Sequence, residues 1–384
     1  MINVAIIGTG NISPKHIEAY LKFPERCKIV ALVDIYPEKA EAKAKEFNLT
    51  DVEIYDSHKA LLDKEDLHLV SVCTPPYVHK EISVDFLNHG KNVLVEKPMA
   101  ASLEECDAMI KAQKESGKLL AVIAQNRFRD SIMGLKQILD TDLIGKVLSA
   151  EVNSLWWRGR CYYDLWWRGT WEKEGGGCTL NHAVHHIDMI NWMMGMPKKV
   201  SALVANVGHD NSEVEDLSVA LLEYGNGAIG RITSSLVHHG EKQGLCFQGE
   251  KASINAPWEV YAYESESNGF PRENPELKNK IEDFYKSLKP LEYKEHAGEI
   301  ENVLYALENG VQPLITAESG RNTIELITAI YKAGFSKSTV ELPIQPDDNF
   351  YTVDGIMNNI KKFYEKTGNV ENFENVKITV GSTY

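Results

Sequence analysis

Two separate stretches of the chain carry residues that could move a proton. Lys97 follows the short apolar run from Asn92 to Val95 and stands in the sequence Val-Glu-Lys-Pro. An amine at the end of a buried strand can act as an acid or a base, because partial burial and a nearby cation lower its pKa. Taken alone, Lys97 fits a solvated lysine at the end of a strand better, since lysine side chains are rarely buried.

The second stretch begins at Gly175-Gly176-Gly177 and continues into a helical pattern from Cys178 to Met194. In one continuous helix, Asn181, His185 and Asp188 would lie at positions i, i+4 and i+7 on the same face. A polar stripe on an otherwise apolar helix needs a reason, and an imidazole beside a lysine suits proton transfer from a hydroxyl. The alternative is a hydrogen-bonded histidine of the core.

Three histidines in this pattern also raise the question of a metal ion. His182, His185 and His186 have the spacing that can bring two imidazoles to one ion. The sequence defines no third protein ligand, and we therefore expect no metal site.

A glycine-containing loop near the N-terminus points to a nucleotide. Gly8-Thr9-Gly10-Asn11-Ile12-Ser13 follows an apolar run and precedes a helical pattern. Gly8 permits a tight turn, Gly10 lets the backbone approach a pyrophosphate, and the helix N-terminus offers free N–H groups. Asp34 ends the next apolar run, and its carboxylate would bind ribose hydroxyls and repel a 2′-phosphate. The loop therefore predicts NAD rather than NADP, the alternative being an ordinary loop followed by a surface aspartate.

The elements around this loop predict a doubly wound parallel sheet. Short apolar runs alternate with amphipathic segments through the first 125 residues. Continuous apolar strands are buried on both faces, and alternation with helices is typical of parallel crossovers. We therefore expect an NAD-binding Rossmann domain over residues 1–125, with strands at 3–8, 28–33, 67–73, 92–95 and 119–124.

The pattern changes after residue 129. Longer strands are expected at 146–157, 200–207, 216–224, 228–237 and 245–255, and Tyr224-Gly225-Asn226-Gly227 is a strong hairpin signal. These features predict an α+β domain over residues 126–345 with a large, mainly antiparallel open sheet. A helix is expected at 322–333. Residues 346–384 form a C-terminal extension with a helix at 353–367 and a polar tail.

Composition excludes several classes of function. The net charge of −14 disfavours nucleic acid and anionic membranes. No apolar run is long enough for a transmembrane helix, and the N-terminus lacks the features of a signal peptide. The six scattered cysteines fit reduced thiols. We expect a cytoplasmic protein that binds a small molecule, with neither nucleic acid nor membrane as a partner.

Tryptophans concentrate just before the triple glycine. Five of the seven lie between Trp156 and Trp171, interleaved with arginines and tyrosines. Pyranose rings stack on aromatic planes, and arginine binds hydroxyls. Core packing or an oligomer interface would also concentrate tryptophan and tyrosine, and we expect both explanations to hold in part.

These motifs together resemble the glucose–fructose oxidoreductase and inositol dehydrogenase (Gfo/Idh/MocA) family, over residues 2 to about 343. The resemblance rests on the glycine loop, on Asp34, on the Glu-Lys-Pro sequence at Lys97, and on the spacing of Asn181, His185 and Asp188 after the triple glycine. It implies an NAD-dependent oxidoreductase, with Lys97 and His185 handling the hydroxyl proton while hydride leaves the same carbon. It also implies oligomer contacts through the open sheet, in a homodimer or a homotetramer.

The resemblance also implies which residues line the site. Those expected at the cofactor are Gly8, Gly10, Asn11, Ile12, Asp34, Thr74, Pro75, His79, Glu96, Asn126, Trp167 and Arg168. Those expected at the substrate are Lys97, Trp157, Tyr163, Arg168, Asn181, His182, His185 and His296. Many family members carry aspartate at the position of Asn181. An amide can orient His185 but cannot share its proton, and asparagine here resembles the subset that acts on pyranosides and anhydrosugars.

The sequence thus predicts NAD-dependent oxidation of a secondary hydroxyl of a pyranose or glycoside, with C3 as a candidate position. Inositol or cyclitol oxidation and sugar carbonyl reduction are alternatives. Two further alternatives are a redox-neutral glycosidase that uses bound NAD and a non-catalytic sensor of NAD or sugar. Lys97 and His185 argue against the sensor, which needs neither group.

Overall fold

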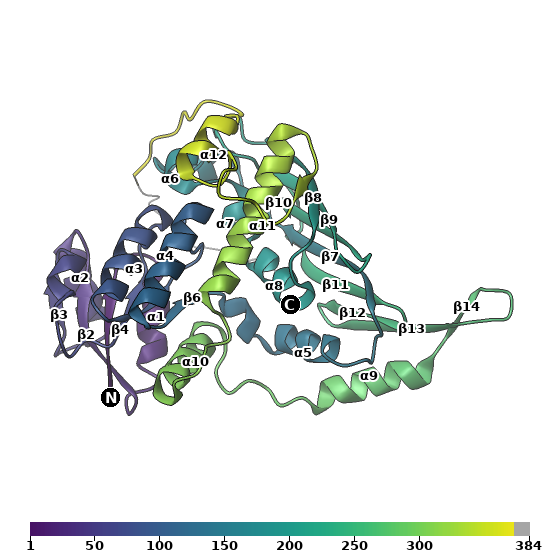
Figure 1. Cartoon of the computed structure of the whole chain (residues 1–384), viewed down its shortest axis with the longest axis horizontal. Helices are drawn as coiled ribbons and strands as arrows, with labels where there is room; N and C mark the ends of the chain where they lie inside the picture. The colour runs from purple at the N-terminus through teal and green to yellow at the C-terminus, as the bar shows by residue number, and fades with distance from the viewer. Residues whose placement is uncertain (372–384) are drawn as a thin grey trace. The chain divides into compact units, whose positions relative to one another are not determined.

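The computed structural model describes residues 1–371, which divide into two compact units (Figure 1). The first unit comprises Met1–Phe128 and Leu291–Ile324, and the second comprises Arg129–Pro290 and the chain from Glu325 onward. The first unit therefore combines the N-terminal part of the chain with a segment that follows more than 150 residues later in the sequence.

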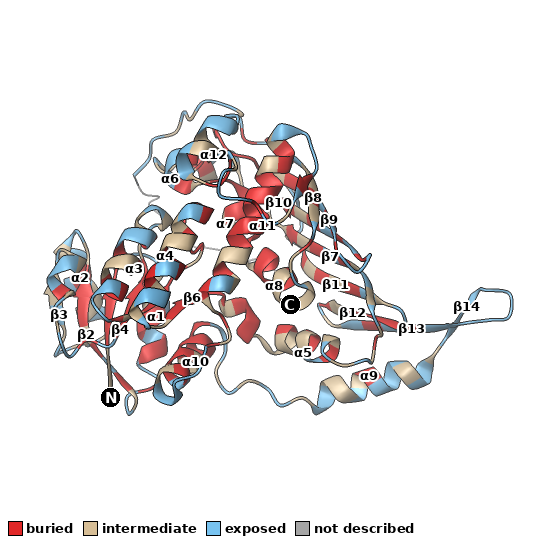
Figure 2. Ribbon diagram, in the orientation of Figure 1, coloured by how far each residue is buried: buried red, intermediate tan, exposed pale blue. Residues whose placement is uncertain are grey.

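The first unit contains the predicted parallel sheet. Its six strands run in the order β3-β2-β1-β4-β5-β6, and all neighbouring pairs are parallel. The strands are β1 (Ile2–Ile7), β2 (Cys27–Val33), β3 (Glu53–Tyr55), β4 (Leu69–Val72), β5 (Asn92–Val95) and β6 (Leu120–Val122). The chain order reverses direction between β1 and β4, and the carboxyl ends of the strands at such a switch point form the usual ligand crevice. The central strands are buried on both faces (Figure 2), which explains their uninterrupted apolar sequence.

Helices cover this sheet as the alternating pattern predicts. They are α1 (Ser13–Tyr20), α2 (Pro37–Glu46), α3 (His79–Asn88) and α4 (Leu103–Ser116), with short 3₁₀ helices η1 (His58–Leu61), η2 (Pro76–Val78) and η3 (Gln125–Phe128). The late helix α10 (Glu295–Asn309) packs against α1, where Ile300 and Leu304 share one apolar cluster with Ile17 and Tyr20. No sequence pattern predicts the place of α10 beside α1, because the two helices lie far apart in the chain.

The second unit contains a mixed sheet of nine strands in the order β14-β13-β12-β11-β7-β10-β9-β8-β15. Every pair is antiparallel except β7 and β10, which run parallel. The strands are β7 (Val147–Leu155), β8 (Lys199–Ala205), β9 (Leu217–Glu223), β10 (Ile229–Ser235), β11 (Gln243–Gly249), β12 (Ala252–Ala256), β13 (Glu259–Ser265), β14 (Pro271–Glu273) and β15 (Val340–Glu341). The predicted single strand over 245–255 is wrong, because the chain turns at Glu250 and Lys251 and pairs β11 with β12.

Helices of the second unit contact this sheet at several places: α5 contacts β12, α7 contacts β9 and β10, α8 contacts β7, and α9 contacts β13. The helices are α5 (Asp130–Leu139), η4 (Arg160–Asp164), α6 (Trp171–Glu174), α7 (Cys178–Asn181), α8 (Val184–Met194), α9 (Pro275–Ser287) and α12 (Val353–Asn359). Helix α11 (Ala317–Ser336) begins in the first unit and belongs to the second from Glu325 onward. The helix predicted over 353–367 ends early at Asn359, and an extended segment follows it. The polar tail predicted beyond Glu371 lies outside the described residues.

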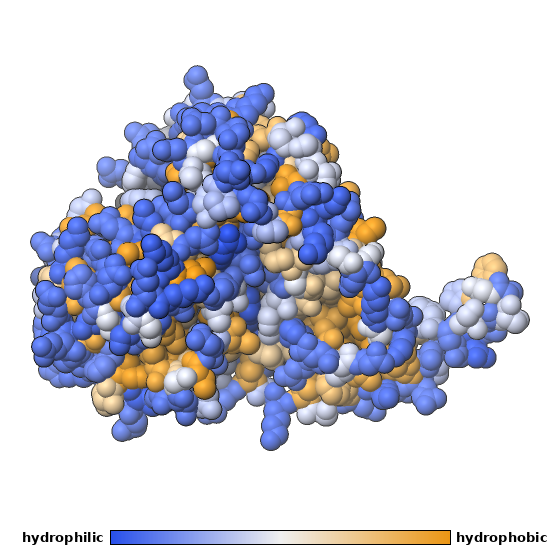
Figure 3. Space-filling model, in the orientation of Figure 1, coloured by the Kyte–Doolittle hydropathy of each residue, from blue (hydrophilic) through white to orange (hydrophobic). Residues whose placement is uncertain are grey.

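Hydrophilic residues dominate the face drawn in Figure 3, and apolar residues occur there in separate patches. Within residues 1–371, no helix combines the length and the apolar character needed to cross a membrane.

Candidate active site

The glycine loop has the geometry that its sequence predicts. Gly8 follows β1 with a φ of +91°, and a Cβ atom there would lie 2.9 Å from the carbonyl oxygen of Cys73. A Cβ built on Gly10 would meet no described atom within 4 Å. The hydroxyl of Ser13 donates to the Gly10 carbonyl at 2.9 Å and closes the turn into α1. The loop is therefore held tightly at Gly8 and left open at Gly10, where a phosphate would approach.

Asp34 lies directly beside this loop. One of its carboxylate oxygens accepts the backbone N–H of Thr9 at 2.9 Å and the Thr9 hydroxyl at 2.8 Å. The other oxygen accepts the N–H of Tyr36 at 3.0 Å. The negative charge is thus fixed next to the predicted phosphate loop, as required of a group that binds ribose and repels a 2′-phosphate.

The connection after β4 carries a second feature that fits a cofactor. The Thr74 hydroxyl is buried, and its oxygen has no hydrogen-bond partner among the described residues. The buried His79 ring lies between two carbonyl oxygens, 2.8 Å from that of Thr74 and 3.0 Å from that of Pro98. An unsatisfied buried hydroxyl calls for a ligand or water, so Thr74 fits the predicted cofactor contact. Pro75 next to it is exposed.

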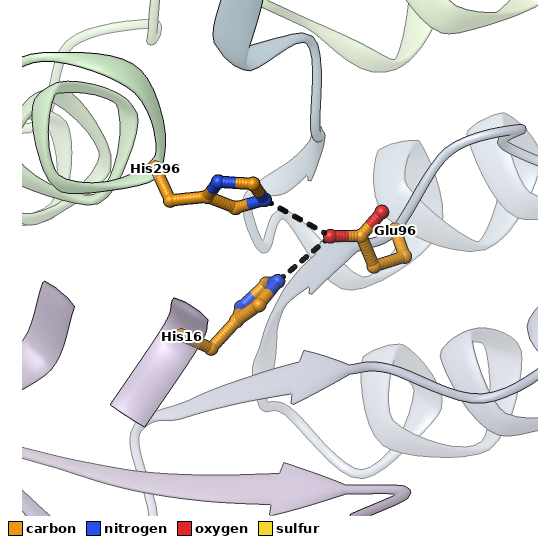
Figure 4. Close-up of side chains that lie close together, drawn as sticks. All are labelled: His16, Glu96 and His296. Carbon is orange, nitrogen blue, oxygen red and sulfur yellow. Dashed lines mark hydrogen bonds and ion pairs between the residues drawn. The ribbon is translucent and has the colours of Figure 1, made fainter. Parts of the chain in front are cut away.

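Glu96 is the centre of a buried polar cluster at the carboxyl end of β5 (Figure 4). The Nε2 atom of His16 lies 2.9 Å from Oε1 of Glu96, and Nε2 of His296 lies 3.5 Å from the same oxygen. The other oxygen, Oε2, accepts the backbone N–H of Lys97 at 3.1 Å. Burial by itself raises the pKa of Glu96, but the hydrogen bond from His16 and the interaction with the His296 imidazole bring it well below its usual value. Glu96 is therefore an ionised carboxylate that is hydrogen-bonded to the backbone of Lys97.

A chain of hydrogen bonds sets the tautomer of His16. Burial lowers the pKa of His16, so its ring is neutral at neutral pH. Because ionised Glu96 can only accept, Nε2 of His16 carries the proton. Its Nδ1 then accepts from Ser71, 3.3 Å away, and Ser71 accepts from the Tyr20 hydroxyl at 2.7 Å. The three groups His16, Glu96 and His296 could also hold a metal ion by proximity alone, but the hydrogen-bonded tautomer explains the contact between His16 and Glu96 without one.

This cluster contains one residue that was predicted at the substrate, His296, and one that sequence reasoning missed, His16. His296 was predicted at the substrate, and the structure pairs it with Glu96 in the first unit. His16 was missed, although a histidine on the buried side of the first helix was a usable signal. Lys97 is half-buried and Asn126, in η3, is buried. Their predicted roles at the cofactor and the hydroxyl stay predictions, as do those of Asn11 and Ile12.

In the second unit, the triple glycine is required by close packing. A Cβ on Gly176 would overlap the Tyr331 hydroxyl, and one on Gly177 would overlap the Glu215 carbonyl. Buried Glu215 accepts the N–H of Gly177 at 3.0 Å, the N–H of Thr179 at 2.9 Å and the hydroxyl of Tyr331 at 3.0 Å. Sequence reasoning missed Glu215, which lies in a loop outside every motif.

The helix after the glycines is not continuous, so the prediction of one helix from Cys178 to Met194 is wrong. Helix α7 ends at Asn181, and α8 starts at Val184 after a turn. The Asn181 amide donates to the carbonyls of Gly176 at 2.7 Å and Gly177 at 3.3 Å, so it closes the glycine loop. His185 is half-buried near the start of α8. Its proposed proton transfer, and its orientation by Asn181, stay predictions.

The tryptophan-rich stretch from residue 156 to residue 171, here called the aromatic segment, forms a polar and aromatic cluster. The guanidinium of Arg168 lies 4.2 Å from the ring centroid of Tyr162 and 4.3 Å from that of Trp167. It donates to the Tyr162 hydroxyl and, at 3.1 Å, to Glu174. The Tyr162 hydroxyl also lies 3.3 Å from Nε2 of His182. Arg168 and His182, predicted from separate motifs, are thus linked through Tyr162.

Glu174 is the second carboxylate that sequence reasoning missed. It is buried, and burial raises its pKa to about 7, although Arg168 and the N–H of Gly169 partly oppose this shift. The N–H of Gly169 donates to its Oε2 at 2.5 Å. A carboxyl group with a pKa near neutrality is common at functional sites, but structural ion pairs produce the same shift.

The two other residues of the aromatic segment that were predicted at the substrate, Trp157 and Tyr163, differ in exposure. Trp157 is 44% exposed and stacks on His239, with ring centroids 5.4 Å apart. Tyr163 is 1% exposed, and its ring packs edge-on against His209 at 5.0 Å. Trp157 is accessible to a ligand within its unit, whereas Tyr163 contributes to packing there.

The predicted catalytic residues are divided between the two units. Lys97 and Glu96 belong to the first unit, and Asn181, His185 and the aromatic segment belong to the second.

Comparison with family models assigns both parts of the chain. Residues 2–124 match the model described as "Oxidoreductase family, NAD-binding Rossmann fold". Residues 136–342 match the model described as "Oxidoreductase family, C-terminal alpha/beta domain" of the same family, GFO_IDH_MocA.

Three characterised proteins illustrate the similarity. The chain is 28% identical over 259 residues to 2,7-anhydro-N-acetylneuraminate hydratase of Mediterraneibacter gnavus, an alignment covering 66% of each chain. It is 26% identical over 367 residues to D-glucoside 3-dehydrogenase of Escherichia coli, covering 89% of this chain and 97% of the relative. The WlbA dehydrogenase of Bordetella pertussis, solved in complex with NADH and UDP-GlcNAcA, superimposes with a TM-score of 0.76 and 26% identity, over 90% of this chain and 99% of the other.

Proposed function

Because this chain belongs to the GFO/IDH/MocA family of NAD-binding oxidoreductases, we propose that it oxidises a secondary hydroxyl of a neutral pyranose or glycoside, with C3 as the first position to test. The observation that carries the proposal is the aromatic segment, in which Arg168 stacks between Tyr162 and Trp167 beside the glycine loop that precedes His185. Aromatic faces bind the C–H surface of a sugar ring, and the polar groups between them bind its hydroxyls.

The pairing of the arginines supports a neutral sugar. Arg158 pairs with Glu241 at 2.5 Å, Arg160 with Asp210 at 2.7 Å and Arg168 with Glu174 at 3.1 Å. Each arginine of the aromatic segment thus has a carboxylate partner. A sugar acid would have to displace one of these carboxylates, whereas a neutral glycoside leaves all three pairs intact. The hydratase of Mediterraneibacter gnavus is named for a sugar acid, and the WlbA dehydrogenase was solved with one; the paired arginines favour a neutral substrate for the present chain instead.

Bound NAD would supply the hydride acceptor for such an oxidation. The first unit fits this cofactor through the open position above Gly10, the fixed carboxylate of Asp34 and the unsatisfied hydroxyl of Thr74. Lys97 would receive the hydroxyl proton while the carbon loses its hydride, so a secondary alcohol becomes a ketone and one proton is released. His185 would bind the same hydroxyl and assist that transfer. Ionised Glu96 would hold the backbone of Lys97 in place through its N–H.

The first test is turnover. The protein would be incubated with NAD and, separately, NADP against neutral pyranoses, glycosides, cyclitols and sugar acids, and nicotinamide reduction followed by absorbance. We expect reduction of NAD with a neutral pyranoside. Reduction only with cyclitols or only with sugar acids would contradict the proposed substrate class.

A redox-neutral reaction is the second candidate, because the relative from Mediterraneibacter gnavus is named a hydratase rather than a dehydrogenase. If no compound of the panel causes nicotinamide reduction, and NAD is found bound to the purified protein, the redox-neutral reaction is favoured.

The variant Lys97→Ala should abolish turnover and keep NAD binding. Lys111→Ala is its matched control, because Lys111 is an exposed lysine on α4 of the same unit. Unchanged turnover in Lys97→Ala would exclude Lys97 as the base.

We further propose that the outward face of the nine-stranded sheet makes a homo-oligomer contact. Leu203, Leu221 and Ile229, on the neighbouring strands β8, β9 and β10, are 67%, 52% and 57% exposed. Exposed apolar side chains on adjacent strands favour association with another surface. Light scattering after gel filtration should show a dimer or a tetramer, and Leu221→Glu should shift it toward the monomer. A monomeric wild-type protein would refute this proposal.

A further inference from the structure

The C-terminal extension does not end at its helix. After α12, residues 361–371 follow an extended path within the second unit and contact the aromatic segment of the same unit. We call residues 361–371 the C-terminal strap. Its contacts fall at three places along the aromatic segment.

The first contact joins the two backbones. Val370 and Leu165 form a parallel bridge. The N–H of Val370 donates to the carbonyl of Asp164 at 2.8 Å, and the N–H of Trp166 donates to the carbonyl of Val370 at 3.0 Å. The strap therefore binds the aromatic segment as a short added strand, immediately before Trp167 and Arg168.

The second contact is made through Glu213. This buried side chain receives the ammonium of Lys362 at 2.7 Å and the N–H of Trp171 at 3.2 Å. Its carbonyl accepts the N–H of Phe363 and the indole N–H of Trp171, both at 3.0 Å. One residue thus joins the strap to the end of the aromatic segment, and loss of the strap would remove a partner from a buried carboxylate.

The third contact involves Lys366 and Gly368. The Lys366 ammonium donates to the carbonyl of Tyr163. It also interacts with the carboxylates of Asp164, Glu174 and Glu213. A Cβ on Gly368 would overlap the backbone of Asp164. The strap and the aromatic segment therefore approach each other so closely at this point that only glycine fits.

We propose that the C-terminal strap is a positioning element that holds the aromatic segment in its sugar-binding conformation. This inference rests on the proposed function for the identity of the ligand. The strap itself need not touch the sugar: it acts by fixing the backbone from Tyr163 to Trp166, from which Trp167 and Arg168 project. A segment ordered before binding loses less entropy when the sugar arrives, so the strap lowers KM for the sugar and leaves NAD binding in the first unit unchanged.

The experiment uses the full chain with variants of the strap. Gly368→Val removes the room for close approach, and Lys366→Met removes the ammonium, whereas Lys366→Arg should retain the contact. Lys361→Met is the matched control, because Lys361 is an exposed lysine at the start of the strap. Hydrogen exchange of residues 162–170, KM and kcat for the best sugar, and the Kd of NAD would be measured for each variant.

We expect Gly368→Val and Lys366→Met to expose the Trp166 amide to exchange and to raise KM for the sugar about tenfold or more, with kcat and the Kd of NAD close to wild type. Lys366→Arg and Lys361→Met should behave like wild type. Unchanged exchange in both strap variants would overturn the positioning role. Faster exchange with an unchanged KM would overturn its link to sugar binding. A wild-type protein that binds and oxidises no sugar would refute the proposed function and the sugar-binding part of this inference, while the exchange data would still decide whether the strap holds the segment.

Discussion

The imidazole of His16 and the carboxylate of Glu96 form a buried hydrogen bond of 2.9 Å that links the first helix of the parallel sheet to the end of its fifth strand. Because the Glu96 carboxylate also receives the N–H of Lys97, we expect His16 to stabilise the turn that presents Lys97. His16→Ala should lower the free energy of unfolding by about 2 kcal/mol, the usual loss for a hydrogen bond to a charged group. His16→Asn keeps a donor and should lose less. Urea unfolding checks both variants, and equal stability of His16→Ala and wild type would contradict the prediction.

Cofactor choice should depend on Asp34. Asp34→Asn retains an oxygen that can accept from Thr9 but removes the negative charge beside the glycine loop. We expect kcat/KM with NAD to fall about tenfold or more, because charged hydrogen bonds to the ribose are lost. The ratio of NADP to NAD activity should rise, because repulsion of the 2′-phosphate disappears. An unchanged ratio in steady-state kinetics would show that another group selects the cofactor.

Two glycine variants should separate cofactor binding from folding. Gly10→Ala adds a methyl group where no described atom lies within 4 Å, so the protein without cofactor should keep its melting temperature but bind NAD more weakly. Gly177→Ala places the same group onto the Glu215 carbonyl and should destabilise the protein by about 3 kcal/mol or more, as severe overpacking does. Thermal unfolding with and without NAD distinguishes the two effects. A large loss of stability in Gly10→Ala would contradict the assignment of its open side to the cofactor.

Stability should depend on pH through Glu174. Its pKa is raised to about 7 in the folded protein, so between its ordinary value and pH 7 the folded state holds a proton that the unfolded state has released. The stabilisation is therefore complete below the ordinary pKa and is lost as the pH rises to 7 and above, by up to about 3 kcal/mol. Glu174→Gln should remove this part of the pH dependence, and the exposed neighbour Glu172→Gln is the control. Identical slopes of unfolding free energy against pH in wild type and Glu174→Gln would refute it.

Periodicity and turn chemistry predicted most of the parallel sheet. Strands buried on both faces, such as β4 and β5, are uninterrupted apolar runs, and Ser102 caps α4 by accepting the N–H of Glu105 at 3.3 Å. The hairpin between β9 and β10 also follows its sequence signal, closed by the Tyr224 and Ala228 backbones. These features depend on residues that are neighbours in the sequence, and for that reason the sequence alone predicts them.

Features that depend on distant contacts could not be predicted in this way. The break after Asn181 leaves the helical pattern intact in the sequence, and the break is accompanied by amide donation from Asn181 to the glycine loop. The pairing of Glu96 with His296 joins residues 200 positions apart, and only the packing of α10 on α1 brings them together. Glu174 and Glu215 carry no sequence signal, because an acidic residue is usually exposed until a fold buries it.

The parallel pairing of β7 with β10 has a consequence for how the second unit assembles. All residues from Trp156 to Ala228, including the aromatic segment, the triple glycine and His185, lie between these two paired strands in the chain. Bringing the ends of so long a stretch together costs conformational entropy before the hydrogen bonds between the two strands can form. Contacts between distant parts of a chain therefore form slowly. We therefore expect the proposed sugar-binding residues to become ordered late in folding, after the parallel sheet of the first unit, whose strand pairs span shorter stretches of chain.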